Sequence, residues 1–184
     1  INLLAGQTRM KQQPCRLAEI GAASVRKVES QAQLKLVTVE FTVEPPDLVM
    51  EADSEALTQL LYNLLDNAVK FTPTGGAAGL RIGRRVEVDA ALDLFEFTVW
   101  DTGIGIDDGE HNRIFEAFAQ ADGGLARRYQ GIGLGLAYAR RMADLMGGEV
   151  RVESTVGQGS RFIVTLPAPA VQGAVLPPPE PAAS

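Results

Sequence analysis

A leucine-rich stretch, NLLDNAVKF at residues 63–71, carries two asparagines and a lysine at a spacing that can serve chemistry. At the helical rotation per residue, Asn63, Asn67 and Lys70 fall within roughly 60° of one another. Amide oxygens suit a hard cation such as Mg²⁺, which takes oxygen ligands and keeps substrate phosphates among them. A lysine one turn further along supplies the point charge that a phosphate needs. The alternative is an ordinary solvated helix face, so this stripe alone is a weak signal.

A second candidate is Asp101, which ends the apolar stretch FEFTVW and precedes a glycine-rich loop. A carboxylate accepts hydrogen bonds and donates none, which suits an exocyclic amine such as N6 of adenine. Gly103 and Gly105 alternate with isoleucines, so the backbone can approach a flat ligand closely while apolar side chains wall it. The alternative is a simple Asp-Gly turn.

A third candidate is the glycine cluster around Gly131, Gly133 and Gly135, which opens the last long helix of the sequence. Free N–H groups at a helix N-terminus bind anions. A dinucleotide-binding loop is excluded because it should leave a strand directly, and a P-loop is excluded because no Gly-Lys-Ser/Thr occurs. A flexible helix entry remains the alternative.

These residues need elements that position them, and hydrophobic periodicity predicts such elements. Asp53 is expected to cap the helix that carries the asparagines. The prediction is an α+β fold, a two-layer sandwich of a mostly antiparallel sheet on a helical layer. The expected helices lie at about 16–33, after Asp53 and at about 133–146, with a short one near RIFEAF. The expected strands lie at 37–43, 48–50, 80–88 and 94–100, with a final hairpin after Gly148.

Composition narrows the class of protein. The net charge is −6 and the 17 basic residues are scattered, which argues against a nucleic-acid partner. Cys15 is the single cysteine, so no intrachain disulfide forms and a reducing compartment fits. No apolar run has the length of a membrane span. The first residue is Ile1, so a piece of a longer protein is expected, with residues 1–15 as a linker, 16–167 as one domain and 168–184 as a Pro/Ala-rich disordered tail.

Five sequence motifs taken together are a much stronger indication of function than any of the three candidates alone. NLLDNAVKFTP, DTGIGI, RIFEAF, GIGLGLAYARRMADLMGG and STVGQGSRF occur in this order. Together they resemble the N box, the glycine boxes and the F box of the ATP-binding catalytic domain of bacterial sensor histidine kinases. The resemblance covers about residues 34–166. It implies the Bergerat α/β sandwich of the GHKL superfamily, shared with gyrase, heat-shock chaperone and mismatch-repair ATPases, with a mobile ATP lid.

The resemblance also implies roles for individual residues. Asn67 is similar to the Mg²⁺ ligand, Asn63 to its partner on the metal, and Lys70 to a phosphate contact. Asp101 is similar to the adenine-reading carboxylate. The resemblance also implies that Gly103 and Gly105 shape the base pocket. It implies a lid at 119–132 that carries Arg127 and Arg128 near the γ-phosphate and is anchored by Phe115 and Phe118. The hinge of this lid and the start of the following helix would be formed by Gly131, Gly133, Leu134 and Gly135.

Asn63 bears on the type of reaction. In the related hydrolytic ATPases, the residue one turn before the metal-binding asparagine is a glutamate that activates water. An amide cannot take a proton, so poor hydrolysis is expected. Transfer to a neutral imidazole needs no strong base, and positioning with charge neutralisation by Mg²⁺ suffices. This favours a kinase over an ATPase.

The phosphoacceptor is not expected in this chain. His111 is its only histidine and is interpreted as a surface residue. The resemblance implies a histidine on a separate dimerisation domain of the same parent protein, and a response regulator downstream. The chain is expected to be monomeric alone, cytoplasmic and without membrane contact, although its parent can be membrane-anchored. The chain departs from the family pattern at Gln130, Ile132 and Ala117. A degenerate regulatory nucleotide-binding module therefore remains an alternative. A second alternative is an anti-sigma-factor-type serine kinase.

Overall fold

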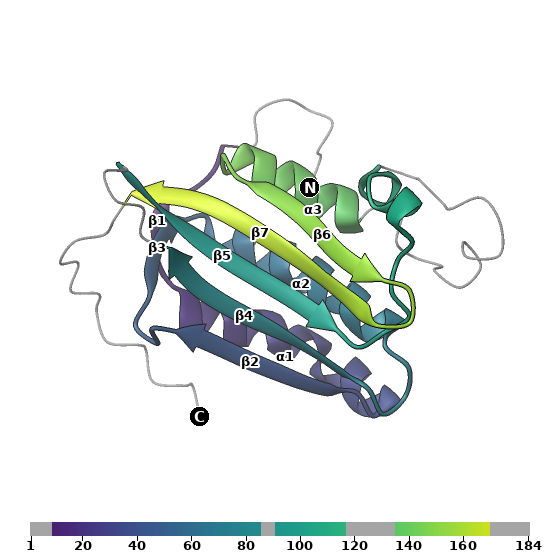
Figure 1. Ribbon diagram of the computed structural model, residues 1–184. Coiled ribbons are helices and arrows are strands. Elements are labelled where there is room, and N and C mark those ends of the chain that lie inside the picture. The colour runs from purple at the N-terminus through teal and green to yellow at the C-terminus, as the bar shows by residue number, and fades with distance from the viewer. Residues whose placement is uncertain (1–8, 86–90, 117–134, 170–184) are drawn as a thin grey trace, which may run out of the picture.

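A five-stranded sheet with helices on one face forms the body of the protein (Figure 1). The structure, a computed structural model, describes residues 9–85, 91–116 and 135–169. Its elements are β1 (Gln13–Arg16), α1 (Leu17–Lys35), β2 (Thr38–Glu44), β3 (Val49–Ala52), α2 (Ser54–Phe71), β4 (Ala77–Arg85), β5 (Leu92–Asp101), the short 3-10 helices η1 (Asp108–Glu110) and η2 (Arg113–Phe115), α3 (Gly135–Leu145), β6 (Glu149–Thr155) and β7 (Gly159–Pro169). The predicted two-layer α+β sandwich is confirmed.

The strands of the main sheet run in the order β2-β4-β5-β7-β6. The β2–β4 pair is parallel, because α2 lies between these strands in the chain, and the other neighbours are antiparallel. β5 is therefore the central strand. At its carboxyl end, Asp101 lies between Ala78 of β4 and Ser160 of β7.

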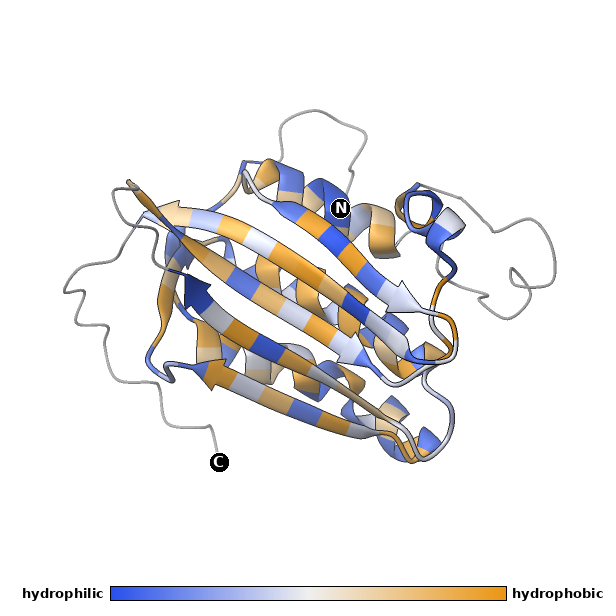
Figure 2. Cartoon of the chain, in the orientation of Figure 1, coloured by the Kyte–Doolittle hydropathy of each residue, from blue (hydrophilic) through white to orange (hydrophobic). Residues whose placement is uncertain are grey.

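Alternation along the strands separates the two faces of the sheet. On β5, Phe95, Phe97 and Val99 are buried, and Asp101 continues the same row at the strand end. Figure 2 shows the same alternation of hydrophobic and hydrophilic residues along β2 and β4. Since side chains alternate between faces, Asp101 points to the side that the helices cover.

Helix α2 is the centre of the helical layer and packs against α1, α3, β4 and β5. It begins as predicted, because the Asp53 carboxylate accepts a hydrogen bond from the Ala56 N–H at 3.0 Å. Its leucines at 57, 60, 61, 64 and 65 are fully buried. This apolar stripe fixes the rotation of α2 and thereby the direction of its asparagines.

Secondary structure extends beyond both expected domain boundaries. Residues 13–15, expected in the linker, belong to β1, which pairs antiparallel with β3. β7 runs on to Pro169, where a tail was expected from residue 168, because Leu92 of β5 still pairs there. No helix within residues 9–85, 91–116 and 135–169 is long and apolar enough to cross a membrane.

Candidate functional site

Two of the three predicted polar residues of α2 lie on its partly buried side. Asn67 is 4% exposed, and its Nδ2 has no hydrogen-bond partner among the described residues. Asn63 is partly buried, and its Oδ1 accepts a hydrogen bond from Gln59 Nε2 at 3.0 Å. A buried amide without a partner costs about 1–3 kcal/mol, so the Nδ2 donor of Asn67 is suited to a polar acceptor from a ligand.

The environment of Lys70 differs from that of the two asparagines. Its side chain is exposed, and its Nζ pairs with Asp66 Oδ2 at 2.7 Å. The helix end beside it already has a cation, because Lys35 Nζ donates to the carbonyls of Val69 and Lys70 at 2.8 Å each. In this structure Lys70 therefore forms a helical i,i+4 ion pair, and a phosphate contact requires that it leave Asp66.

Asp101 is a buried carboxylate at the end of β5. It is 7% exposed, and its Oδ1 accepts a hydrogen bond from the Gly103 N–H at 2.8 Å. Burial raises the pKa of Asp101 from 3.8 to about 6, while hydrogen bonds from the backbone of Gly103 and Ser160 partly offset that rise. No charged side chain within the described ranges contributes to this pKa, so among these residues the carboxylate has no ionic partner and can bind a donor from a ligand.

The loop at residues 102–106 follows Asp101, and its close packing against other backbone explains why it contains two glycines. A Cβ on Gly103 would lie 2.4 Å from the Phe71 carbonyl oxygen at the end of α2. Gly105 has a φ of +73°, and its Cβ would lie 2.1 Å from the Thr155 carbonyl oxygen. Both glycines are thus needed for close packing on the protein's own α2 and β6, and the approach of this loop to a flat ligand stays a prediction.

Gly135 brings the start of α3 to the asparagines of α2. A Cβ placed on Gly135 would lie 3.9 Å from Asn63 Cβ and 3.9 Å from Asn67 Nδ2. The amide face of α2, the end of β5 with its loop, and the first turn of α3 thus converge. Three segments that are distant in the sequence form one polar corner between the sheet and the helices.

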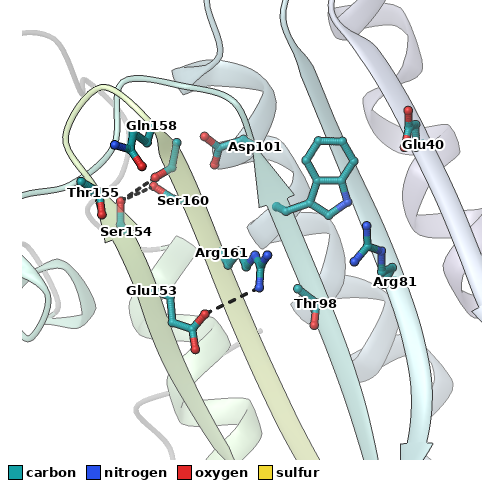
Figure 3. A pocket seen from close by; sticks show the side chains of 12 residues that line it. Glu40, Arg81, Thr98, Asp101, Glu153, Ser154, Thr155, Gln158, Ser160 and Arg161 are labelled. Carbon is teal, nitrogen blue, oxygen red and sulfur yellow. Dashed lines mark hydrogen bonds and ion pairs between the residues drawn. The ribbon is translucent and has the colours of Figure 1, made fainter.

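Two serines extend this corner, and sequence reasoning gave them no role. Asp101, Ser160 and Ser154 are successive cross-strand partners on β5, β7 and β6, so they share one face of the sheet. Ser154 Oγ lies 2.7 Å from Ser160 Oγ, and Figure 3 shows the two hydroxyls turned toward each other. The motif STVGQGSRF contains both serines, but only the strand pairing shows that they continue the row of Asp101.

Part of the predicted site lies outside the described residues. This holds for Arg127, Arg128, Gly131, Gly133, Leu134 and Phe118, and for the whole predicted lid at 119–132. Of the predicted anchors, Phe115 is described. It is buried, meets the Phe162 ring edge-on at 6.0 Å between centroids, and lies under the Arg140 guanidinium at 5.7 Å.

His111 is less exposed than expected. Its side chain is 22% exposed, and its Nε2 lies 3.3 Å from the Ile106 carbonyl oxygen. The interpretation as a plain surface residue is therefore corrected, because His111 packs against the end of the loop at 102–106.

Metal binding at this corner would depend on amides. The described part of the chain holds no group of three or more His, Cys, Asp or Glu residues suited to a metal ion. Asn63 and Asn67 offer amide oxygens, and a Mg²⁺ ion bound by few protein ligands completes its shell with water and phosphate oxygens. The atom of Asn67 without a partner is the donor Nδ2, which suits a phosphate or water oxygen, whereas its Oδ1 is the atom that could bind the metal.

A separate hollow of about 400 Å³ lies on the other face of the sheet (Figure 3). Trp100, Arg81 and Arg161 line it, and they alternate with the residues that face the helices. Asp101, Ser154 and Ser160 of the polar corner also line this hollow. The asparagines of α2 do not line it.

Comparison with known proteins gives consistent results. Residues 52–170 match the family described as histidine kinase-, DNA gyrase B- and HSP90-like ATPases. The circadian input-output histidine kinase CikA of Synechococcus elongatus is 38% identical over 165 residues, which is 89% of this chain and 21% of CikA. The sensor protein GacS of Pseudomonas syringae is 40% identical over 138 residues, 74% of this chain and 15% of GacS. The chain thus spans less than a third of these relatives.

Solved structures agree with the fold. The structure of full-length ShkA in complex with AMPPNP superposes with a TM-score of 0.75 at 32% identity, over 90% of this chain and 33% of ShkA. The catalytic domain of the histidine kinase ThkA, in a nucleotide-free form, superposes with a TM-score of 0.73 at 25% identity, over 86% of this chain and 97% of that domain.

Proposed function

Because the chain belongs to the histidine kinase-, DNA gyrase B- and HSP90-like ATPase family, we propose that it is the ATP-binding catalytic domain of a sensor histidine kinase. It would transfer the γ-phosphate of ATP to a histidine on a separate dimerisation domain of its parent protein. The observation that carries this proposal is Asp101, a buried carboxylate whose pKa no charged side chain of the described residues shifts, and whose following loop packs on the end of α2.

Asp101 is the group that would read the base. Its Oδ1 already accepts from Gly103, and a carboxylate has lone pairs left for the N6 amine of adenine. Guanine presents a carbonyl oxygen at the equivalent ring position, which a carboxylate repels. We therefore expect a preference for adenine nucleotides over guanine nucleotides.

Asn67 and Asn63 would hold the triphosphate side of the nucleotide. Mg²⁺ bound there neutralises charge on the phosphate oxygens, and the two amides position it. Arg127 and Arg128, outside the described residues, are proposed γ-phosphate contacts. Gly131, Gly133, Leu134 and Gly135 are proposed to form the phosphate-facing entry to α3. Gly135 supports this, because its lack of a side chain keeps the space beside Asn67 open.

Kinase rather than ATPase activity follows from Asn63. Its amide already accepts a hydrogen bond from Gln59 and cannot accept a proton from water. A histidine acceptor brings its own lone pair, so no base is needed at this position. The names of CikA and GacS, a histidine kinase and a sensor protein, support this assignment.

Partners follow from the same reasoning. A histidine-bearing dimerisation domain of the parent protein would deliver the acceptor, and a response regulator would take the phosphoryl group from it. A solved complex of ThkA with the response regulator TrrA provides a precedent among the structural neighbours for such an assembly. The domain would work in the cytoplasm, where ATP is available.

Calorimetric titration tests the proposal. Mg²⁺–AMPPNP is titrated into the wild-type chain and into Asp101→Asn, with circular dichroism to confirm folding. We expect micromolar-to-millimolar binding by the wild type and at least tenfold weaker binding by the variant, since a charged hydrogen bond contributes about 1.5–3 kcal/mol. A folded wild-type chain that binds no adenine nucleotide would contradict the proposal.

A second step separates the classes of acceptor. The chain is mixed with ATP and either a histidine-hairpin domain or a serine-bearing anti-sigma-factor antagonist. Labelling of the histidine supports the proposal. Labelling of the serine alone would favour the serine kinase, and nucleotide binding without any transfer would favour the regulatory module.

A further inference from the structure

We propose that Ser154 of β6 is a positioning residue that holds the loop at 102–106 and, through it, the Asp101 carboxylate. The inference rests on the proposed role of Asp101 in adenine binding. It concerns a residue that contacts the loop rather than the nucleotide.

The direction of the key hydrogen bond is unambiguous. Ser154 Oγ lies 2.7 Å from the backbone nitrogen of Ile106, and because an N–H only donates, Ser154 is the acceptor. The hydroxyl also lies 3.0 Å from the Gly159 carbonyl oxygen and 2.7 Å from Ser160 Oγ. These contacts fix the hydroxyl between β6 and β7, as the paired serines of Figure 3 show.

The loop is tied to the strands along its length. Thr102 N donates to the Ala77 carbonyl oxygen at 2.9 Å, and Gly157 N donates to the Ile104 carbonyl oxygen at 2.8 Å. At the two ends, Asp101 accepts from Gly103 and Ser154 accepts from Ile106. Two side chains of one cross-strand row, Asp101 and Ser154, thus hold the loop at its two ends.

Loss of the Ser154 hydroxyl removes the acceptor for the Ile106 N–H. The loop end next to His111 then loses one of its ties, and the Gly103 N–H is held less firmly against Asp101. That N–H is one of two backbone groups that lower the pKa of Asp101 against the effect of burial. A looser loop therefore leaves more Asp101 protonated near pH 6 and 7, and the protonated form accepts poorly from adenine.

The surroundings of Asp101 allow this effect to be isolated. Its neighbours across the sheet are Ala78 and Ser160, and its loop touches the Phe71 backbone of α2. None of these groups titrates near pH 6, and no charged side chain among the described residues contributes to the pKa. Asp107 and Asp108 follow Ile106 in the chain, and His111 Nε2 lies 3.3 Å from the Ile106 carbonyl oxygen, so His111→Gln is included to remove the imidazole from the loop end.

The experiment measures ADP affinity from pH 5.5 to 8.5 for the wild type, S154A, S154T and S24A. Ser24 is the matched control, because its buried hydroxyl donates to the Ile20 carbonyl oxygen at 2.8 Å within α1. The phosphates of ADP titrate in the same way in every measurement, so they do not cause differences between the variants. Each comparison is repeated in the His111→Gln background.

We expect S154A to bind ADP about two- to threefold more weakly at pH 6.5, because a higher pKa leaves less of the Asp101 carboxylate ionised. The pH midpoint for binding should rise by about half a unit or more. S154T keeps a hydroxyl and should show the ADP affinity and the pH midpoint of the wild type. S24A should change the unfolding temperature and leave the pH midpoint unchanged.

The outcomes are distinguishable. A midpoint in S154A equal to that of the wild type, or an equal shift in S24A, overturns the positioning role. Wild-type protein that is folded yet binds no ADP, or an Asp101→Asn variant that binds like the wild type, overturns the proposed function instead.

Discussion

Gly135 at the start of α3 lies against Asn67 of α2, since a Cβ on this glycine would be 3.9 Å from Asn67 Nδ2. The buried amide of Asn67 has no hydrogen-bond partner in the described part of the chain. A backbone without a side chain thus faces an amide without a partner. In the proposed function, a phosphate oxygen of the Mg²⁺-bound nucleotide would give this Nδ2 donor its acceptor.

The first prediction concerns base recognition by Asp101. Asp101→Asn should weaken ADP binding tenfold or more and remove most discrimination against GDP, because an amide presents a donor as well as an acceptor. Competition titrations with ADP and GDP measure both. Asp93→Asn is the matched control, since Asp93 is an equally buried carboxylate on the same face of β5 but pairs with Arg84 at the other end of the strand. An equal loss of affinity in both variants would contradict the prediction.

The second prediction concerns pH and stability. For an acid whose pKa is raised from 3.8 to about 6 on folding, the folded state binds the proton more tightly than the unfolded state. The unfolding free energy therefore carries a penalty from Asp101 that is absent below pH 3.8, grows between these values and is full above about 6. The full penalty corresponds to about 3 kcal/mol.

Asp101→Asn removes this titration. We expect the variant to gain about 1–2 kcal/mol of unfolding free energy relative to the wild type at pH 7.5, and to lose that advantage near pH 4. Urea denaturation at the two pH values measures it. The same stability difference at both pH values would show that Asp101 ionises as it does in water.

The third prediction concerns Asn67. Asn67→Ala should abolish the gain in nucleotide affinity that Mg²⁺ confers, while the unfolding free energy of the ligand-free chain falls by less than about 1 kcal/mol. The loss is small because the substitution removes an unpartnered buried amide. ADP titrations with Mg²⁺ and with EDTA, together with denaturation curves, provide the readouts. Asn112→Ala serves as control, because Asn112 precedes η2 and makes no capping hydrogen bond with its side chain. A large loss of stability without loss of the Mg²⁺ effect would assign Asn67 to the core.

The fourth prediction concerns Lys70 and its ion pair with Asp66. An exposed i,i+4 pair contributes about 0.3–0.5 kcal/mol, so Lys70→Ala should barely change stability. If Lys70 contacts phosphate, the variant should lose affinity for ATP and not for adenosine. Asp66→Asn should then strengthen ATP binding, because it releases the ammonium group. An Asp66→Asn variant with weaker ATP binding would show that the pair itself is needed.

The fifth prediction concerns the glycines. Gly105→Ala should cost about 3 kcal/mol or more, since φ is +73° and the new methyl group meets the Thr155 carbonyl oxygen at 2.1 Å. Gly83→Ala is the control, because no atom lies within 4 Å of its Cβ position and its φ is unremarkable. Thermal denaturation of both variants tests this. Equal melting temperatures would mean that the loop at 102–106 adapts freely.

Local patterns in the sequence determined the elements and the candidate residues. The cap at Asp53, the leucine stripe of α2 and the alternation on β5 each depend on neighbours within a few residues, so periodicity predicts them. The order of the five motifs then indicated the fold and the roles of Asn67 and Asp101. Their chemistry, amide and carboxylate, is a property of the residue type alone.

Only the tertiary structure decided which groups meet. The row of Asp101, Ser160 and Ser154 depends on the order and register of three strands, which no short sequence window contains. The burial of Asn67, whose Nδ2 has no partner among the described residues, depends on how α2 is rotated against the sheet and α3. Burial sets the pKa of Asp101, and burial is a property of the packed layers. Sequence spacing fixes what a residue can do, whereas long-range packing fixes its partners.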